Sequence, residues 1–165
     1  STKSSPWLQF TWKGEIMARR SKYGVDISAK GKRDRTYKGI QYDSKSEMLF
    51  YKEFIEPLEK SGEIIKTERQ VTYVLQEGFT NFEGKEVLPI KYKSDFDCTY
   101  KDGTLVVFDI KGQADSLSLL KRKMIWHQYP NLNFKFVGRS LVDGGWIEYD
   151  KLKKLRSARK KKKDK

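Results

Sequence analysis

The dipeptide Asp102-Gly103 constrains the fold of this chain most strongly, because it lies between two stretches of strand-forming residues. Residues 87–100 read as extended, and residues 104–110 form a nearly continuous apolar run. Asp-Gly is typical of a tight turn between antiparallel strands. We therefore expect a hairpin in which residues 104–110 form a central strand, with Pro89 at an edge or a bulge of its partner.

Three charged residues stand on these two strands. Asp95 lies on the first, and Asp109 and Lys111 lie two positions apart on the second, so they share a face. If the strands pair around the turn, position 95 falls opposite roughly position 110, within reach of a shared metal ion. Two carboxylates can hold a hard divalent cation, and a lysine beside them can orient or activate a water.

These three residues also have a simpler interpretation. Asp95 can be a turn or surface acid, and Asp109 can be a strand-end acid that pairs with Lys111. However, charges inside an apolar run are costly to bury unless they are paired or bind a metal. This cost favours the metal-binding interpretation, more strongly for Asp109 and Lys111 than for Asp95.

The remaining pattern predicts one α/β domain over residues 39–150. Ser44 and Glu47 form a capping box that opens a helix over residues 44–60, and Pro57 should end or kink it. The periodicity and composition of the rest predict strands at 71–76, 134–137 and 146–149, a loop or hairpin tip at 78–84, and a second helix at 115–128. Residues 150–163 can continue as a helix. The expected order is helix, three strands, helix, strand.

Three further polar residues are candidates for the same site. Glu47 is either a cap or a third carboxylate directed at the metal, and spacing alone favours the cap. Asp97 shares the face of Asp95 in a regular strand; it either assists metal binding or solvates the strand edge, and the second role is favoured. Gln113 either positions a water or phosphate or begins a turn with Gly112, and the sequence favours neither.

The single cysteine and single histidine exclude other chemistries. Cys98 is expected in the core and His127 at a helix end, so a zinc site of Cys and His ligands is not expected. No motif supports a Ser-His-Asp or Cys-His mechanism or a phosphate-binding glycine loop. One cysteine suits a reducing cytosol, and neither a membrane-spanning apolar run nor a signal peptide is recognisable, so we expect a cytoplasmic protein without membrane contact.

Positive charge is concentrated in two arms. The formal net charge is +13; residues 17–38 carry eight Lys/Arg and two acids, and residues 151–165 carry ten and one. The centre is slightly acidic. Residues 1–16 are either foreign to the natural chain, with Met17 as its start, or a short strand. Basic arms suit a polyanion, although a solubilising or localisation role is the alternative for the C-terminal run. Expected DNA contacts are Arg19, Arg20, Lys32, Arg33, Arg35, Lys121, Arg122 and Lys123.

Taken together, the residues resemble the PD-(D/E)xK nuclease superfamily. Its αβββαβ core carries an acid on the second strand and an acid-x-lysine on the third, which match Asp95 and the segment from Asp109 to Lys111. Many members also have a glutamate on the first helix, which matches Glu47. Ser94 stands where the signature has proline. The segments 42–47, 93–96 and 120–123 further resemble small phage-encoded, Holliday-junction-resolvase-like endonucleases of this superfamily.

This resemblance implies a restriction-endonuclease-like fold with a central mixed sheet flanked by helices. It also implies a metal-dependent DNA endonuclease, selective for branched DNA, that works in phage recombination or DNA processing in the host cytoplasm. Mg²⁺ or Mn²⁺ would be held by Asp95, Asp109, the carbonyl of Ile110 and Glu47, while Lys111 orients water. A resolvase cuts two strands, so a homodimer is expected. The alternatives are a nuclease for flaps, single strands or a specific duplex, or a non-catalytic nucleic-acid-binding protein.

Overall fold

The computed structural model describes residues 24–164, and the chain divides into two compact units between Gln41 and Tyr42. Residues 1–23, including the predicted DNA contacts Arg19 and Arg20 and the question of residues 1–16, lie outside the described part. In the first unit, helix α1 (Ala29–Asp34) is capped by Ser28, whose Oγ accepts from the amide of Gly31 at 3.1 Å. Strands β1 (Thr36–Tyr37) and β2 (Ile40–Gln41) form a small hairpin.

The basic segment thus contains a short helix and a hairpin, which its composition did not predict. The hairpin turn contains Lys38 and Gly39, with φ of 48° and 79°. Two residues with left-handed φ values are typical of the two-residue turns that join antiparallel strands. The Ser28 cap and this turn were not recognised among the basic residues of the segment.

The second unit opens with one continuous helix over residues 45–60, as expected. It comprises α2 (Lys45–Phe50), a π-helical turn η1 (Tyr51–Ile55) and α3 (Glu56–Lys60). Pro57 was expected to end or kink the helix, and it does not end it, because the helix continues to Lys60. Pro57 lacks an N–H, and the preceding turn is widened, with the amide of Glu56 bonded to the carbonyl of Tyr51.

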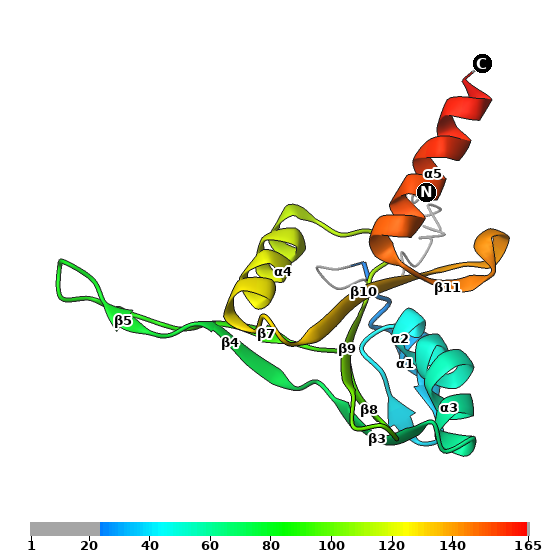
Figure 1. The fold of residues 1–165 in the computed structure, drawn as a ribbon, viewed down its shortest axis with the longest axis horizontal. Coiled ribbons are helices and arrows are strands. Elements are labelled where there is room, and N and C mark those ends of the chain that lie inside the picture. The colour runs from blue at the N-terminus through cyan, green and yellow to red at the C-terminus, as the bar shows by residue number, and fades with distance from the viewer. Residues whose placement is uncertain (1–23, 165) are drawn as a thin grey trace, which may run out of the picture. The chain divides into compact units, whose positions relative to one another are not determined.

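A five-stranded mixed sheet forms the centre of this unit (Figure 1), in the order β11-β10-β9-β8-β3. Its strands are β3 (Ile64–Arg69), β8 (Phe96–Tyr100), β9 (Leu105–Ile110), β10 (Asn133–Ser140) and β11 (Gly145–Glu148). Only β9 and β10 are parallel, and helix α4 (Ser116–Gln128) connects them. The 3₁₀ turn η2 (Leu141–Asp143) precedes β11, and α5 (Tyr149–Lys163) follows it.

Helices cover both faces of the sheet. Phe50 of α2 packs against Phe96 and Phe108, with ring centroids 5.8 and 5.2 Å apart. Val107, which alternates to the other face, shares a buried cluster with Ile125 of α4. Figure 1 accordingly shows α2 and α3 on one side of β8 and β9 and α4 on the other. The predicted mixed α/β fold, with a central mixed sheet flanked by helices, is confirmed.

We expected residues 71–76 to form the first strand of the core, but β3 takes that place. β3 is an edge strand, with only Ile64 buried and Lys66 ion-paired to Glu68. Such an edge looks polar in sequence, so it was missed. Residues 72–76 (β4) instead pair with β7 (Ile90–Lys93) in a separate ribbon, which runs out from the sheet (Figure 1). The ribbon continues through β5 (Phe79–Thr80) and β6 (Glu86–Val87).

Candidate active site

The predicted hairpin exists, and it brings Asp95 to the end of β9. β8 and β9 pair with Phe96 opposite Phe108, and Asp95, just before β8, lies beside Phe108 and Ile110 as expected. The Oδ2 atom of Asp95 accepts a hydrogen bond from the amide of Ile110 at 2.7 Å. The Asp95 amide in turn donates to the carbonyl of Phe108 at 3.2 Å. The carboxylate therefore closes the end of this strand pair beside Asp109.

A break between the sheet and the ribbon allows this orientation. Gln70 has a left-handed φ of 55°, and its amide donates to the carbonyl of Asp95 at 3.3 Å. The buried Ser94 side chain accepts from the amide of Val71 at 3.2 Å and donates to Asp97 at 2.5 Å. Ser94 stands where the resembling superfamily has proline, and here its hydroxyl joins the two sides of the break. The regular strand is interrupted at Asp95, which turns its side chain toward β9.

Asp109 is the most deeply buried of the predicted ligands, with 3% of its surface exposed. Its Oδ2 atom accepts a hydrogen bond from the hydroxyl of Tyr92. Its Oδ1 atom lies 3.0 Å from the ammonium of Lys111, and no second donor binds it among residues 24–164. One oxygen of a buried carboxylate is thus held by an ion pair alone.

Lys111 stays at the site rather than in the apolar interior. Its side chain is 26% exposed, and its ammonium also lies 5.5 Å from the ring centre of Phe136. Burial by itself would lower the pKa of Lys111, but the Asp109 charge and the contact with it raise that pKa above its ordinary value. Lys111 is therefore a cation when no metal is bound.

Glu47 serves the helix cap and also faces the acids. Its amide donates to Ser44 Oγ at 3.1 Å, and its Oε1 accepts from the same hydroxyl at 3.1 Å. The pKa of Glu47 is raised to about 7, first by burial and then by the charge of Asp43, with Asp109 also contributing. The capping role is confirmed, and the charge of Asp109 is one of the causes of the raised pKa.

Burial and mutual repulsion disfavour charge on the carboxylates. Burial raises the pKa of Asp95 to about 8, and the charges of Asp109 and Glu47 contribute to that rise. The pKa of Asp109 is also raised by burial, against the opposing effects of Lys111 and Tyr92. A bound cation would relieve this repulsion and would favour the ionised form of all three acids.

The donor set fits a hard cation held by few protein ligands. Among the described residues, no group of three His, Cys, Asp or Glu side chains is close enough to form a metal site by itself. Two carboxylates and a main-chain oxygen are a different set. The Ile110 amide points toward Asp95, and the carbonyl of a strand residue points to the same side as its amide, so it faces Asp95 too. With Oδ1 of Asp109, which faces Lys111, these oxygens suit Mg²⁺, which keeps several waters.

Asp97 and Gln113 lie outside this group. Asp97 is buried and accepts hydrogen bonds from Ser94 and from the hydroxyl of Tyr73, so it does not solvate a strand edge as expected. Neither Asp95 nor Asp109 is among the groups that shift the pKa of Asp97, which burial raises. Gln113 lies exposed in the bend after β9 and does not continue the face of that strand.

The predicted phosphate contacts have different environments. Lys32 and Arg33 are exposed on α1, but Arg35 is buried and donates to the carbonyl of Asp26 at 2.6 Å, which removes it from the surface. On α4, Lys123 is exposed, whereas Lys121 donates to the carbonyl of Lys91 at 3.0 Å. Arg122 is paired with Asp150 at 3.1 Å and is largely buried.

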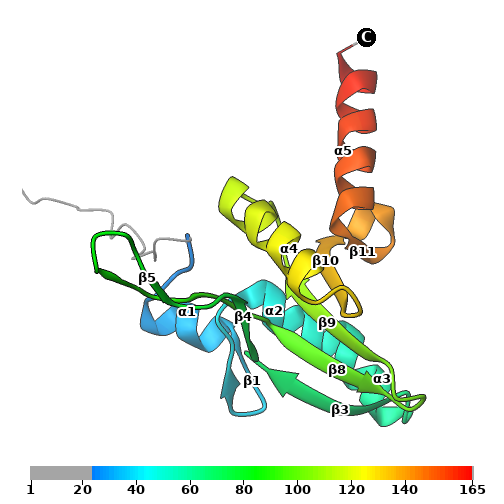
Figure 2. The ribbon, with the colours of Figure 1, turned by 60° about the vertical axis from the view of Figure 1, so that its left-hand side comes forward.

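Helix α5 separates its basic residues into two kinds. Its arginines bind neighbouring segments: Arg156 donates to the carbonyl of Gly112 at 2.8 Å, and Arg159 pairs with Asp143 at 2.6 Å. The lysines at 153, 154 and 161 line an open hollow with Asp150, Ser157 and Ala158, and none of these lysines is ion-paired within residues 24–164. Figure 2 shows this helix rising from the end of β11.

The inner face of α5 is fixed against the turn that follows Lys111. The hydroxyl of Tyr149 accepts from the amide of Ala114 at 3.1 Å, and Leu152 is fully buried. A side chain at Gly138 would meet both Leu152 and the carbonyl of Lys111 within 3.0 Å. The basic C-terminal segment is therefore a helix that packs on the protein next to the strand that carries Asp109.

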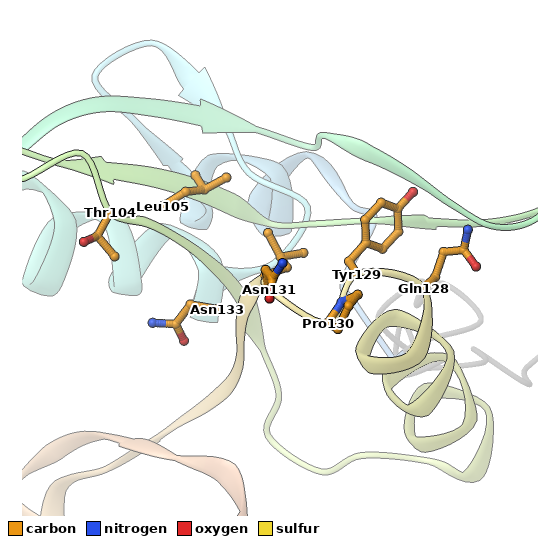
Figure 3. Close-up of a pocket in the computed structure, with 8 residues that line it drawn as sticks. Thr104, Leu105, Gln128, Tyr129, Pro130, Asn131 and Asn133 are labelled. Atoms are coloured by element: carbon orange, nitrogen blue, oxygen red, sulfur yellow. The ribbon is translucent and has the colours of Figure 1, made fainter.

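The hollow drawn in Figure 3 lies at the opposite end of β9. It is lined by Thr104 and Leu105 before or at the start of that strand and by residues 128–133 after α4. No acidic, histidine or lysine side chain lines it. This hollow has none of the chemistry gathered at the other end of the strand.

Neither the contact of Tyr92 with Asp109 nor the side chains that attach α5 were expected from the sequence. Tyr92 lies within a stretch identified only as extended, and nothing in its spacing indicates that its hydroxyl reaches Asp109. Arg156 lies in a run that was considered as a whole for its charge. Helical periodicity would have separated Leu152, Arg156 and Arg159 from the outward lysines. His127 and Cys98 lie as expected, at the exposed end of α4 and in the core.

Comparison with known proteins identifies a family but no activity. A family model described as a protein of unknown function (DUF1064) matches residues 20–144, a range that contains all the predicted carboxylates and Lys111 and ends before α5. Searches of curated proteins and of solved structures gave no match. No described helix has the length and apolar character needed to cross a bilayer. Because the match extends over most of the sequence, the chain belongs to the DUF1064 family of proteins of unknown function.

Proposed function

We propose that this protein is a metal-dependent DNA endonuclease. The observation that carries the proposal is the state of Asp109: it is buried, one oxygen is held by Tyr92, and the other is left to Lys111 at 3.0 Å. Burying a carboxylate is costly unless it is paired or binds a metal, and Asp95 and Glu47 add repulsion to the pairing of Asp109 with Lys111. A buried aspartate beside further acids and a lysine suits a cation and a phosphate.

The chain's residues have distinct roles in this mechanism. Asp95, Asp109 and the Ile110 carbonyl would hold Mg²⁺ or Mn²⁺, with Glu47 directly or through a water. When bound, the metal polarises the scissile phosphate and lowers the pKa of a water. Lys111 orients that water or stabilises charge that develops on the phosphate. The raised pKa values of Glu47 and Asp95 mean that both acids release protons as the site is loaded.

DNA is the substrate that the charge distribution supports. The outward lysines of α5 lack acidic partners among the described residues, and the inner face of this helix is fixed to the turn after Lys111. Lysines of this kind contact phosphates with little dependence on sequence. Exposed Lys123, and Lys32 and Arg33 of the first unit, are further candidates. Selectivity for branched DNA, and a homodimer that cuts two strands, follow from the resemblance to resolvase-like nucleases and belong to the same proposal.

A cleavage panel tests this function. Four-way junction, flap, single-stranded and plain duplex DNA are each incubated with the protein in Mg²⁺, in Mn²⁺ and in EDTA. We expect metal-dependent cutting that is fastest on the junction and is abolished in Asp109→Asn. Asp97→Asn is the matched control, because it alters an equally buried aspartate outside the carboxylate group. Tight binding without cutting of any substrate would instead identify a non-catalytic nucleic-acid-binding protein, and preferential cutting of another substrate would correct the proposed target.

A further inference from the structure

Tyr73 and Tyr92 form a cross-strand pair at the base of the β4–β7 ribbon. They are directly opposite in register, so their side chains share a face of the ribbon. Each hydroxyl donates to a different buried aspartate: Tyr73 to Asp97 and Tyr92 to Asp109. The two bonds are chemically alike, but only one reaches a predicted metal ligand.

Tyr92 is held firmly enough to orient that ligand. Its side chain is 8% exposed and belongs to the buried cluster on the α4 face. Its ring packs edge-on against Phe134, with centroids 5.4 Å apart. Burial and the Asp109 charge raise the pKa of Tyr92 far above its ordinary value, so its hydroxyl remains a donor at any working pH.

The Tyr92 bond decides which oxygen of Asp109 faces Lys111. A carboxylate can rotate about its terminal bond, and that rotation exchanges its two oxygens. Tyr92 occupies Oδ2, so Oδ1 is the atom directed at Lys111, and no second donor binds Oδ1 among the described residues. Partners that fix a ligand's orientation typically change metal affinity by about 10–100-fold when they are removed.

We infer that Tyr92 is a positioning residue for metal binding: through its hydroxyl, the base of the ribbon holds Asp109 with Oδ1 turned toward the cation. This inference rests on the proposed metal-dependent function and adds a residue to it. Tyr92 itself does not contact the cation or the substrate in this arrangement. Its partner Tyr73 donates an equivalent hydrogen bond to Asp97, which lies apart from Asp95, Asp109 and Glu47.

The two tyrosines provide a matched experiment. Tyr92→Phe and Tyr73→Phe each remove one hydroxyl from the ribbon base and one hydrogen bond to a buried aspartate. Mn²⁺ binding to the free protein is measured by calorimetry and by electron paramagnetic resonance, without DNA. We expect Tyr92→Phe to weaken Mn²⁺ binding about 10-fold and Tyr73→Phe to change it less than about 2-fold. Thermal unfolding in EDTA should shift similarly in both variants.

A double-mutant cycle separates positioning from general destabilisation. In an Asp109→Asn background, Tyr92→Phe should cause no further decrease in Mn²⁺ affinity, because the group that it orients is already changed. In cleavage assays, added Mn²⁺ should restore most of the Tyr92→Phe rate, whereas a merely structural defect would not respond to metal.

The outcomes are distinguishable. If the wild type binds Mn²⁺ through Asp109 but Tyr92→Phe binds it as well as Tyr73→Phe does, the positioning role is overturned and the proposed function stands. If the wild type binds no Mn²⁺, or binds it equally well as Asp109→Asn, both the proposed function and this inference are overturned. A decrease confined to Tyr92→Phe, and absent in the Asp109→Asn background, supports the inference.

Discussion

Two neighbouring aspartates, on β8 and β9, have similar surroundings, but one has only hydroxyl partners and the other also faces a lysine. Asp97 and Asp109 are each 3% exposed, and each receives a tyrosine hydroxyl from the base of the same ribbon. Asp97 has a second hydroxyl donor, Ser94, on its other oxygen, whereas that oxygen of Asp109 faces only Lys111. Burial and a tyrosine donor therefore do not distinguish a structural acid from a candidate ligand. The partner of the second oxygen does: it is a hydroxyl for Asp97 and the Lys111 ammonium for Asp109.

The strongest test of this comparison exchanges each acid for its amide. Asp109→Asn should lower the rate of DNA cleavage at least about 10³-fold, because it removes a metal ligand while preserving shape. Asp97→Asn should lower the rate less than about 3-fold. Single-turnover cleavage of the preferred DNA in Mg²⁺ measures both, with circular dichroism as the folding control. Equal decreases in the two variants would remove the distinction between the acids.

A second test concerns the Lys111 ammonium, which faces Oδ1 of Asp109. Lys111→Met should lower the cleavage rate about 100-fold, because it removes the cation that stabilises developing charge. Mn²⁺ affinity should not fall, since Asp109 then has no competing ammonium. The rate and the binding isotherm are measured on the same preparation. Lys101→Met is the control, because Lys101 pairs with Glu63 at 2.5 Å at the other end of the hairpin. A wild-type rate in Lys111→Met would contradict the role of this lysine.

The pH dependence of stability sharpens the comparison further. The pKa values of Glu47 and Asp95 are raised to about 7 and about 8, whereas unfolded carboxyls titrate near 4. Between about pH 4 and pH 8 the folded state binds more protons at these acids than the unfolded state. These acids therefore reduce stability as the pH rises. A bound cation takes the place of those protons, so Mn²⁺ should raise Tm more at pH 8.5 than at pH 5.5.

The matched variants for this pH test are Glu47→Gln and Asp97→Asn, each melted with Mn²⁺ and with EDTA at both pH values. Glu47→Gln should flatten the pH dependence of the Mn²⁺ effect, and Asp97→Asn should leave it unchanged. An equal Mn²⁺ shift at both pH values in the wild type would show that protons and metal do not compete at these carboxylates.

The smallest expected effect lies away from both aspartates, on the outer face of α5. Replacing Lys153, Lys154 and Lys161 by glutamine should weaken DNA binding and lower the slope of log K against log salt by about 0.9 for each phosphate that is no longer neutralised. Cleavage at saturating DNA should persist. Fluorescence anisotropy over a salt series measures the slope. A matched triple variant at Lys60, Lys66 and Lys101, which are all ion-paired, should keep the wild-type slope.

The sequence was most informative where chemistry and secondary structure have the same spacing. Alternation along a strand correctly placed Asp109 beside Lys111, and the Asp-Gly turn correctly brought Asp95 to the same strand end, near Ile110. Edge strand β3 escaped notice, because exposed strands carry charged residues as loops do. The burial of Arg35 and the contact of Tyr92 with Asp109 depend on tertiary packing, which a single sequence does not encode locally.

Helix α5 has a consequence for how this protein can be altered. Its arginines hold the helix in place through Gly112 and Asp143, while the lysines at 153, 154 and 161 take no part in that attachment. Different residues of α5 therefore attach the helix to the protein and form its exposed surface. In the proposed nuclease, the outer lysines could be exchanged for another recognition surface while the helix keeps its attachment, so the choice of target could be varied independently of the cutting step.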